Sequence, residues 1–151
     1  MCLRFVRRRW FGDKKPLRVG YQILLIQKVN QSLKYSSLFQ KYKKEYGVVL
    51  NSDYKKELYG FEDCKPYNAG FHFFRYLKEA KLYAEQDLWP GTKAVIVRVI
   101  GSDVVAYGKD GRWSAINDAY VSEKIEVLDE VWVSELVKAE RKLKKIPILN
   151  P

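Results

Sequence analysis

Ala94-Val95-Ile96-Val97-Arg98-Val99-Ile100 is the stretch that decides the fold of this chain of 151 residues. It is almost continuously apolar and rich in β-branched side chains, which favours a buried strand over a helix. Strands that are apolar on both faces lie inside a sheet, so we expect this one to be central. Arg98 interrupts the run. It fits an edge position, a buried ion pair or a contact surface, and the sequence leaves these three open.

Further strand-like stretches lie on both sides of this central strand. Gly101-Ser102-Asp103 carries turn residues, so we expect the central strand to end there, before a short strand at 104–107. Residues 121–133 alternate apolar and polar positions, which is typical of a strand with one buried face. Residues 2–11 mix apolar and basic side chains and fit either an edge strand or an arm. The remaining predicted strands are 19–29, 48–50 and 70–74.

The sequence predicts two helices. Residues 76–86 repeat apolar side chains at steps of three and four, and Pro90-Gly91 ends the pattern. Ser134 has the chemistry of an N-cap for a second helix at 135–145. The resulting order β, β, α, β, β, β, α predicts one α+β domain with a mixed or antiparallel sheet, one central helix and a C-terminal helix.

Composition restricts the class of protein. With 47% hydrophobic and 15% aromatic residues, the chain is too apolar to be disordered. Cys2 and Cys64 stand apart and there is one histidine, so we expect neither a zinc site nor a disulfide framework. No apolar run approaches the roughly 20 residues of a membrane span, and the start does not resemble a secretory signal. We therefore expect no integral membrane association and an intracellular location, cytoplasmic or nuclear, or a place in a virion, but not secretion.

All of the net charge lies at the two ends of the chain. Residues 1–18 hold seven Lys or Arg against one acid, and residues 138–151 hold five against one. The residues between them hold 16 basic and 16 acidic side chains, so the ends supply the whole net charge of +10. This distribution predicts a basic N-terminal arm (1–18), an α+β core (19–133) and a basic C-terminal helix and tail (134–151).

Such basic ends are typical of proteins that hold nucleic acid or an acidic protein surface, including components of larger assemblies. In the first of them, three consecutive arginines are followed directly by two aromatic residues. Arginine pairs with phosphate through two parallel hydrogen bonds, and aromatic rings stack on bases. The residues that we expect to bind the partner are Arg7, Arg8, Arg9 and Trp10, with Lys142, Lys144 and Lys145 as secondary contacts.

One block of the sequence resembles a known family. Gly70-Phe71-His72-Phe73, a helix with a small residue at Ala80, then Tyr83-Ala84 and the strand at 95–100 resemble the central block of ADP-ribosyltransferases of the poly-ADP-ribose polymerase branch. The family's first-strand motif would fall at Tyr35-Ser36-Ser37, which lacks its histidine and glycine. The resemblance implies an ADP-ribosyltransferase-like fold with NAD as the cofactor.

The same resemblance assigns roles to three residues. His72 and Tyr83 would stack on the nicotinamide of the bound NAD. Glu123 would be the catalytic carboxylate, which stabilises the positive charge that develops on the ribose as the nicotinamide leaves. The enzyme, active or degenerate, is the second of two functional hypotheses.

The Gly-Phe-His-x-Phe strand and its helix also resemble small uncharacterised proteins of bacteria, phages and large DNA viruses, which implies no known activity. The charge distribution and this resemblance favour the first hypothesis. It is a non-enzymatic binding or assembly protein of viral or phage type, without a cofactor, in which a neutral core positions two cationic ends.

Overall fold

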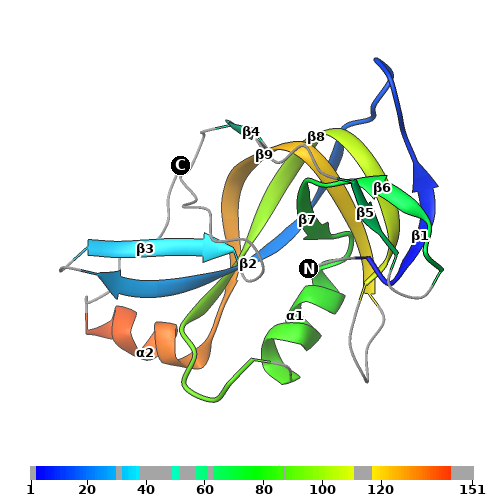
Figure 1. Cartoon of the computed structure of the whole chain (residues 1–151). Helices are drawn as coiled ribbons and strands as arrows, with labels where there is room; N and C mark the ends of the chain where they lie inside the picture. Colours follow the sequence, from blue (N-terminus) through cyan, green and yellow to red (C-terminus); the bar gives the residue numbers. More distant parts are fainter. Residues whose placement is uncertain are drawn as a thin grey trace.

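Antiparallel pairing joins seven strands into one sheet, with a separate two-stranded hairpin beside it (Figure 1). The computed structural model describes residues 3–29, 32–37, 49–51, 57–60, 63–86, 88–110 and 117–143. The elements are β1 (Phe5–Arg9), β2 (Arg18–Val29), β3 (Ser32–Ser37), β4 (Val49–Asn51), β5 (Glu57–Tyr59), β6 (Pro66–Asn68), β7 (Phe71–Phe74), α1 (Leu77–Gln86), β8 (Ala94–Asp110), β9 (Asn117–Val133) and α2 (Glu135–Lys142). The expectation of a single α+β domain with an antiparallel sheet is confirmed.

Four of these strands, β2, β7, β8 and β9, close into a ring. β8 pairs with β2 through Ala94–Gly101 and with β9 along almost its whole length. β7 pairs with β9 on one side and meets β2 at Tyr21 on the other, which completes the ring. The prediction that 94–100 is a central strand is therefore confirmed, because both edges of β8 are hydrogen-bonded there.

The prediction of a turn at 101–103 is wrong. β8 runs through these residues as one strand of 17 residues, and Asp103 has a φ of 53°. At Gly101 an added Cβ would lie 2.4 Å from two ring atoms of Phe73. The missing side chain lets β8 cross over the Phe73 ring, so turn-type residues here bend the strand instead of ending it.

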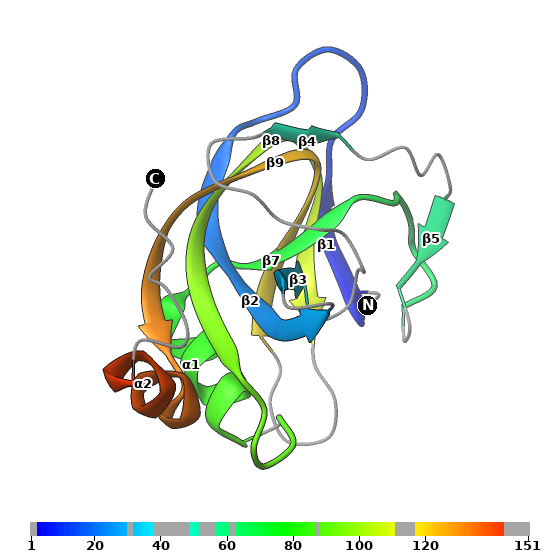
Figure 2. The same ribbon diagram turned by 90° about the vertical axis from the view of Figure 1, so that its left-hand side faces the viewer.

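The ring encloses the largest apolar cluster, which includes Phe71, Phe73 and the alternating valines of β8. α2 packs its buried Val137 against this cluster. α1 covers a second cluster outside the ring, where Ala80 and Ala84 contact the side of β2, β7 and β8 that bears Ile96. β8 and β9 form an arch, with both helices on its lower side and β4, which pairs with the middle of β9, at its top (Figures 1 and 2).

Ser134 and Arg98 each contact a neighbouring strand. The second helix begins after Ser134 as predicted, but the Ser134 side chain does not cap it. Its hydroxyl instead accepts a hydrogen bond from the Ala94 backbone N–H at 3.2 Å, which ties α2 to β8. Arg98 lies neither on an edge strand nor in a buried ion pair, because its strand β8 is paired on both sides and its exposed guanidinium pairs with Asp129 on β9 at 2.8 Å.

None of the helices in the described ranges is long and apolar enough to cross a membrane.

Candidate functional site

The basic N-terminal residues lie on strand β1, at the edge of the sheet. Of the two alternatives for residues 2–11, an arm or an edge strand, the structure therefore has the strand. On one side β1 pairs with β8, and this pairing continues where the Trp10 N–H donates to the Val105 carbonyl at 2.9 Å. On the other side the Val6 N–H donates to the Asp63 carboxylate at 2.8 Å. The Leu3 N–H donates to the Tyr67 hydroxyl at the same distance. Both edges of β1 are thus fastened to the core.

A β-bulge at Arg7 distributes the basic side chains over both faces of β1. Val6 is the register partner of Gly108, but Arg8 is the partner of Tyr107, so one extra residue stands between them. Because neighbouring residues of β8 face opposite ways, Val6 and Arg8 also face opposite ways. Val6 packs into the buried cluster beside Tyr67, whereas Arg8 lies on the face of Tyr107.

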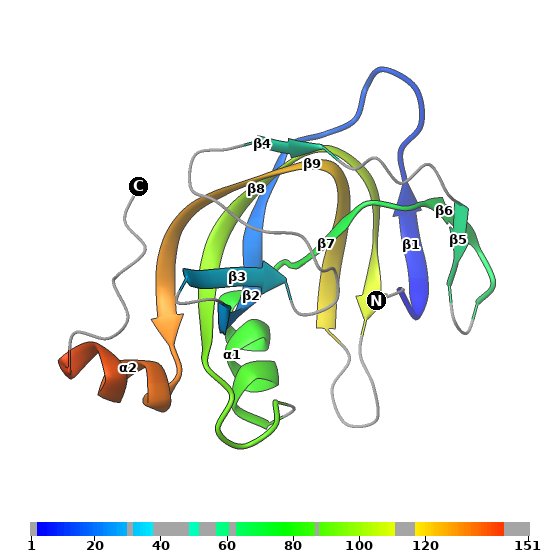
Figure 3. The same ribbon diagram turned by 60° about the vertical axis from the view of Figure 1, so that its left-hand side comes forward.

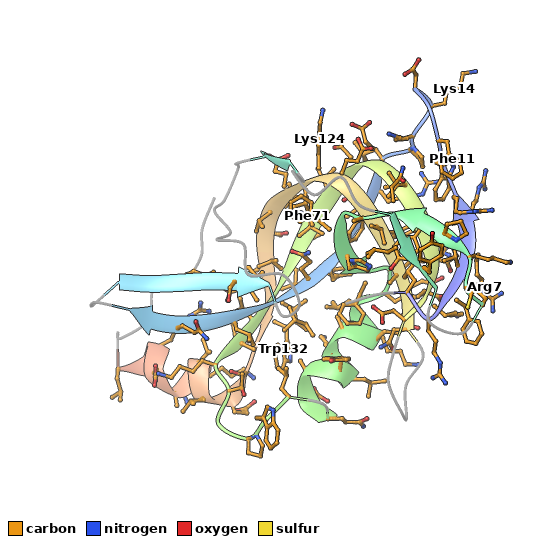
Figure 4. The ribbon with its side chains drawn as sticks, viewed as in Figure 1. Arg7, Phe11, Lys14, Phe71, Lys124 and Trp132 are labelled. Carbon is orange, nitrogen blue, oxygen red and sulfur yellow. The ribbon has the colours of Figure 1, made fainter. Side chains whose placement is uncertain are left out.

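Two of the three arginines of β1 contact aromatic rings. The Arg8 guanidinium lies 4.9 Å from the centre of the Trp10 ring, and the Arg9 guanidinium 5.8 Å from that of Phe11. Arg9 also donates to the Pro66 carbonyl at 3.2 Å. Arg7, Arg8 and Arg9 are exposed, and within the described residues none of them forms an ion pair. Arg7 and Phe11 lie on the outer side of the molecule, whereas Phe71 lies inside (Figure 4).

Several basic residues outside β1 form ion pairs with acids. Lys15 pairs with Glu123 and Lys109 with Asp118, both at 2.6 Å. Arg98 pairs with Asp129, and Arg141 pairs with Glu130. These four charges are neutralised by internal pairs, whereas the charges of Arg7, Arg8 and Arg9 are available to a ligand.

A row of side chains leads from β1 to the core. Register pairs join Arg8 to Tyr107 on β8, Tyr107 to Tyr120 on β9, and Tyr120 to Phe73 on β7. The ring centres of Tyr107 and Tyr120 are 5.1 Å apart, and those of Tyr120 and Phe73 are 5.5 Å apart. Arg75, just after β7, donates to the Tyr107 hydroxyl at 3.2 Å. Burial raises the pKa of Tyr107, so this hydroxyl stays protonated near neutral pH.

The three residues expected for a nicotinamide pocket contact three different neighbours. His72 is buried, and its Nε2 lies 3.5 Å from the Tyr67 hydroxyl. Tyr83 on α1 packs against Phe74, with ring centres 5.8 Å apart. Glu123 holds Lys15. Burial lowers the pKa of His72 to about 3, so its ring is neutral at neutral pH. Because Tyr67 and the core enclose the His72 ring, a nicotinamide could stack on it only after these side chains moved.

The described part of the second basic end, in α2, lies far from the first. Lys142 is exposed in the last turn of α2, and α2 and β1 lie at opposite sides of the molecule (Figures 1 and 3). Lys144 and Lys145 fall outside the described residues. Lys142 therefore does not extend the surface that β1 forms.

Comparison of the chain with protein-family models, with curated proteins and with solved structures gives no match. The resemblance to ADP-ribosyltransferases stays a prediction. Over the described part of the chain, no group of three or more His, Cys, Asp or Glu side chains is placed to hold a metal ion.

Arg75 and Tyr107 also contribute to the basic surface and were not predicted from the sequence. In the sequence, an arginine directly followed by an aromatic residue occurs at Arg75-Tyr76 as it does at Arg9-Trp10. Arg75-Tyr76 also comes directly after a predicted strand, so the sequence contained a signal for Arg75. Tyr107 could not have been found in this way, because its place beside Arg8 depends on the β1–β8 register and on the bulge.

Proposed function

We propose that this protein binds nucleic acid through the exposed arginines of β1 and catalyses no reaction. The observation that carries the proposal is that Arg7, Arg8 and Arg9 are exposed and form no ion pair within the described residues, although the strand that bears them is fastened on both edges. Guanidinium groups held on a fixed strand lose little freedom when they bind phosphate, so the site is ready for a polyanion.

Two features favour nucleic acid over an acidic protein surface. Arg8 lies on the Trp10 ring and Arg9 on the Phe11 ring, so each of these cations is presented beside a face that can stack on a base. Arg8 and Arg9, as neighbours on a strand, also lie on opposite faces of β1. A flexible chain of phosphates can follow such a divided surface more readily than a folded acidic patch can.

The test is the salt dependence of binding, measured by fluorescence anisotropy with labelled single-stranded and duplex DNA. Each phosphate contact contributes about 0.9 to the slope of log K against log salt on duplex DNA. Replacing Arg7, Arg8 and Arg9 with alanine should therefore weaken binding and make the slope shallower by about 2 to 3. The matched control removes the same charge from the helices through Lys78→Ala, Lys81→Ala and Lys138→Ala, and should leave the slope nearly unchanged.

Two outcomes would overturn the proposal. In the first, both triple variants weaken binding equally, which means that only the overall charge matters. In the second, poly-glutamate competes with DNA as well as an oligonucleotide of equal charge does, which means that the partner is an acidic protein. Thermal melting of both variants checks that they remain folded.

A further inference from the structure

Arg75 and Tyr76 form a second cation–aromatic pair on the far side of Tyr107 from β1. The Arg75 guanidinium lies 5.0 Å from the centre of the Tyr76 ring and 5.6 Å from that of Tyr107. Both Arg75 and Tyr76 are exposed, and 44% of the Tyr76 surface is open to solvent. Arg8 and Arg75 thus lie on two sides of the same tyrosine.

The acids nearest to Arg75 are already engaged. Asp118 pairs with Lys109 at 2.6 Å and bonds the Tyr107 hydroxyl. Glu79 accepts a hydrogen bond from the Asp118 backbone N–H at 2.9 Å. Within the described residues Arg75 has no ion pair, so its charge, like that of Arg8, is not neutralised by a contact of its own.

The backbone that carries this pair is held in place. The Arg75 N–H donates to the Asp118 carbonyl at 2.9 Å, which extends the β7–β9 pairing by one residue. The Tyr76 carbonyl accepts from the Ala80 N–H at 3.2 Å, which begins the first turn of α1. Tyr76 is therefore an exposed ring on a fixed support, which lowers the entropy cost of stacking a base on it.

We infer that Arg75 and Tyr76 form a base-stacking subsite that makes this protein prefer single-stranded nucleic acid over duplex. The inference rests on the proposed function, since β1 supplies the main phosphate contacts. A bound single-stranded nucleic acid would extend from Arg8 and Trp10, past Tyr107, to Arg75 and Tyr76. A base presents its face to an aromatic ring only when it is unstacked, so the rings contribute to single-strand binding and add little to duplex binding.

The experiment compares Tyr76→Ala, Tyr76→Phe and the unchanged protein, each titrated into oligo(dT), oligo(rU) and duplex DNA. Loss of one stacking ring should weaken binding of the single strands by about five- to a hundredfold and leave duplex binding unchanged. Tyr76→Phe keeps the ring and should bind all three probes normally. Trp89→Ala is the matched control, because Trp89 is 86% exposed and follows the C-terminal end of α1, whereas Tyr76 precedes its first residue. The ratio of dT to rU affinities shows whether DNA or RNA is preferred.

The outcomes separate this inference from the proposed function. If Tyr76→Ala binds single strands as well as the unchanged protein while the β1 triple variant does not, the subsite is wrong and the proposed function stands. Equal losses on single strands and duplex also reject the subsite, because they indicate a phosphate contact only. If the unchanged protein binds none of the three probes, the proposed function itself fails.

Discussion

Arg8 and Tyr107 face each other across the β1–β8 pair, although Val6, two residues before Arg8, faces the opposite way. The bulge at Arg7 produces this reversal, because it adds one residue to β1 without adding one to β8. The bulge therefore determines that Arg8 lies beside Tyr107, whereas Arg9 contacts the β5–β6 hairpin at Pro66.

Two deletions in β1 test the role of the bulge. Deletion of Arg7 removes only the extra residue, so Val6 still meets Gly108, Arg8 still meets Tyr107 and Trp10 keeps its packing against the main apolar cluster. We expect this deletion to change the free energy of unfolding by less than about 1 kcal/mol. Deletion of Arg7 and Arg8 together would place Arg9 opposite Tyr107 and turn Trp10 to the face of Val6, so it should cost about 2 kcal/mol or more. Urea denaturation measures both variants, and equal losses would show that Arg7 is not the extra residue of the bulge.

Gly101 is expected to tolerate no side chain. The Cβ of Gly101→Ala would meet the Phe73 ring at 2.4 Å, in the enclosed core, so the variant should lose about 1–3 kcal/mol of stability. Replacing the Phe73 ring with the smaller leucine side chain in the Gly101→Ala variant should recover part of this loss, although Phe73→Leu alone is destabilising. A double-mutant cycle measures this coupling. If the two substitutions simply add, the close approach of β8 to Phe73 is not what requires the glycine.

His72 should make folding sensitive to acid. Because burial lowers its pKa to about 3, against about 6.5 in the unfolded chain, the unfolded state binds one more proton between these values. Above pH 6.5 His72 is neutral in both states and does not change the free energy of unfolding with pH. As the pH falls from 6.5 towards 3, the unfolded state binds a proton that the folded state excludes, so the free energy of unfolding decreases. From pH 7 to pH 5 the unchanged protein should lose about 2 kcal/mol more than His72→Gln. Denaturation of both proteins at the two pH values measures this difference, and parallel losses would place the histidine in a solvated site.

Two arginine–carboxylate pairs should differ in their effect on stability. Arg141 and Glu130 are largely buried between α2 and β9, and the bond from Arg141 Nη2 to Glu130 Oε2 is 2.9 Å. Arg141→Met would leave a buried carboxylate unpaired and should cost about 3–5 kcal/mol. Arg98→Met breaks the exposed pair with Asp129 and should cost no more than about 1 kcal/mol. Thermal or urea unfolding ranks the two variants, and a reversed order would contradict the assigned burial.

Local patterns predicted most of the elements. The apolar run at 94–100, the helical spacing from Leu77 to Ala84 and the helix after Ser134 were all identified, because strand and helix periodicities are properties of neighbouring residues. Gly101-Ser102-Asp103 was misread for the same reason. The residues have turn chemistry, but whether a strand ends or bends there depends on what lies across the sheet, here the Phe73 ring.

The candidate site was predicted in part. Arg7, Arg8, Arg9 and Trp10 were singled out from the sequence and lie exposed or half-buried on a surface that carries unneutralised charge. Lys142, which was expected as a secondary contact, lies in α2, and α2 and β1 are at opposite sides of the molecule. Charge counts along a chain carry no information on the direction in which folding sends each end.

The sequence by itself determined both helices and most of the strands, and that the positive charge is concentrated near the termini, because these follow from the identity and spacing of nearby residues. Only the tertiary structure decided the register of β1 on β8, the bulge at Arg7 and the meeting of Arg8, Tyr107 and Arg75. These depend on pairings between segments up to about 100 residues apart. Such pairings are selected by the packing of the whole core, which no local pattern specifies.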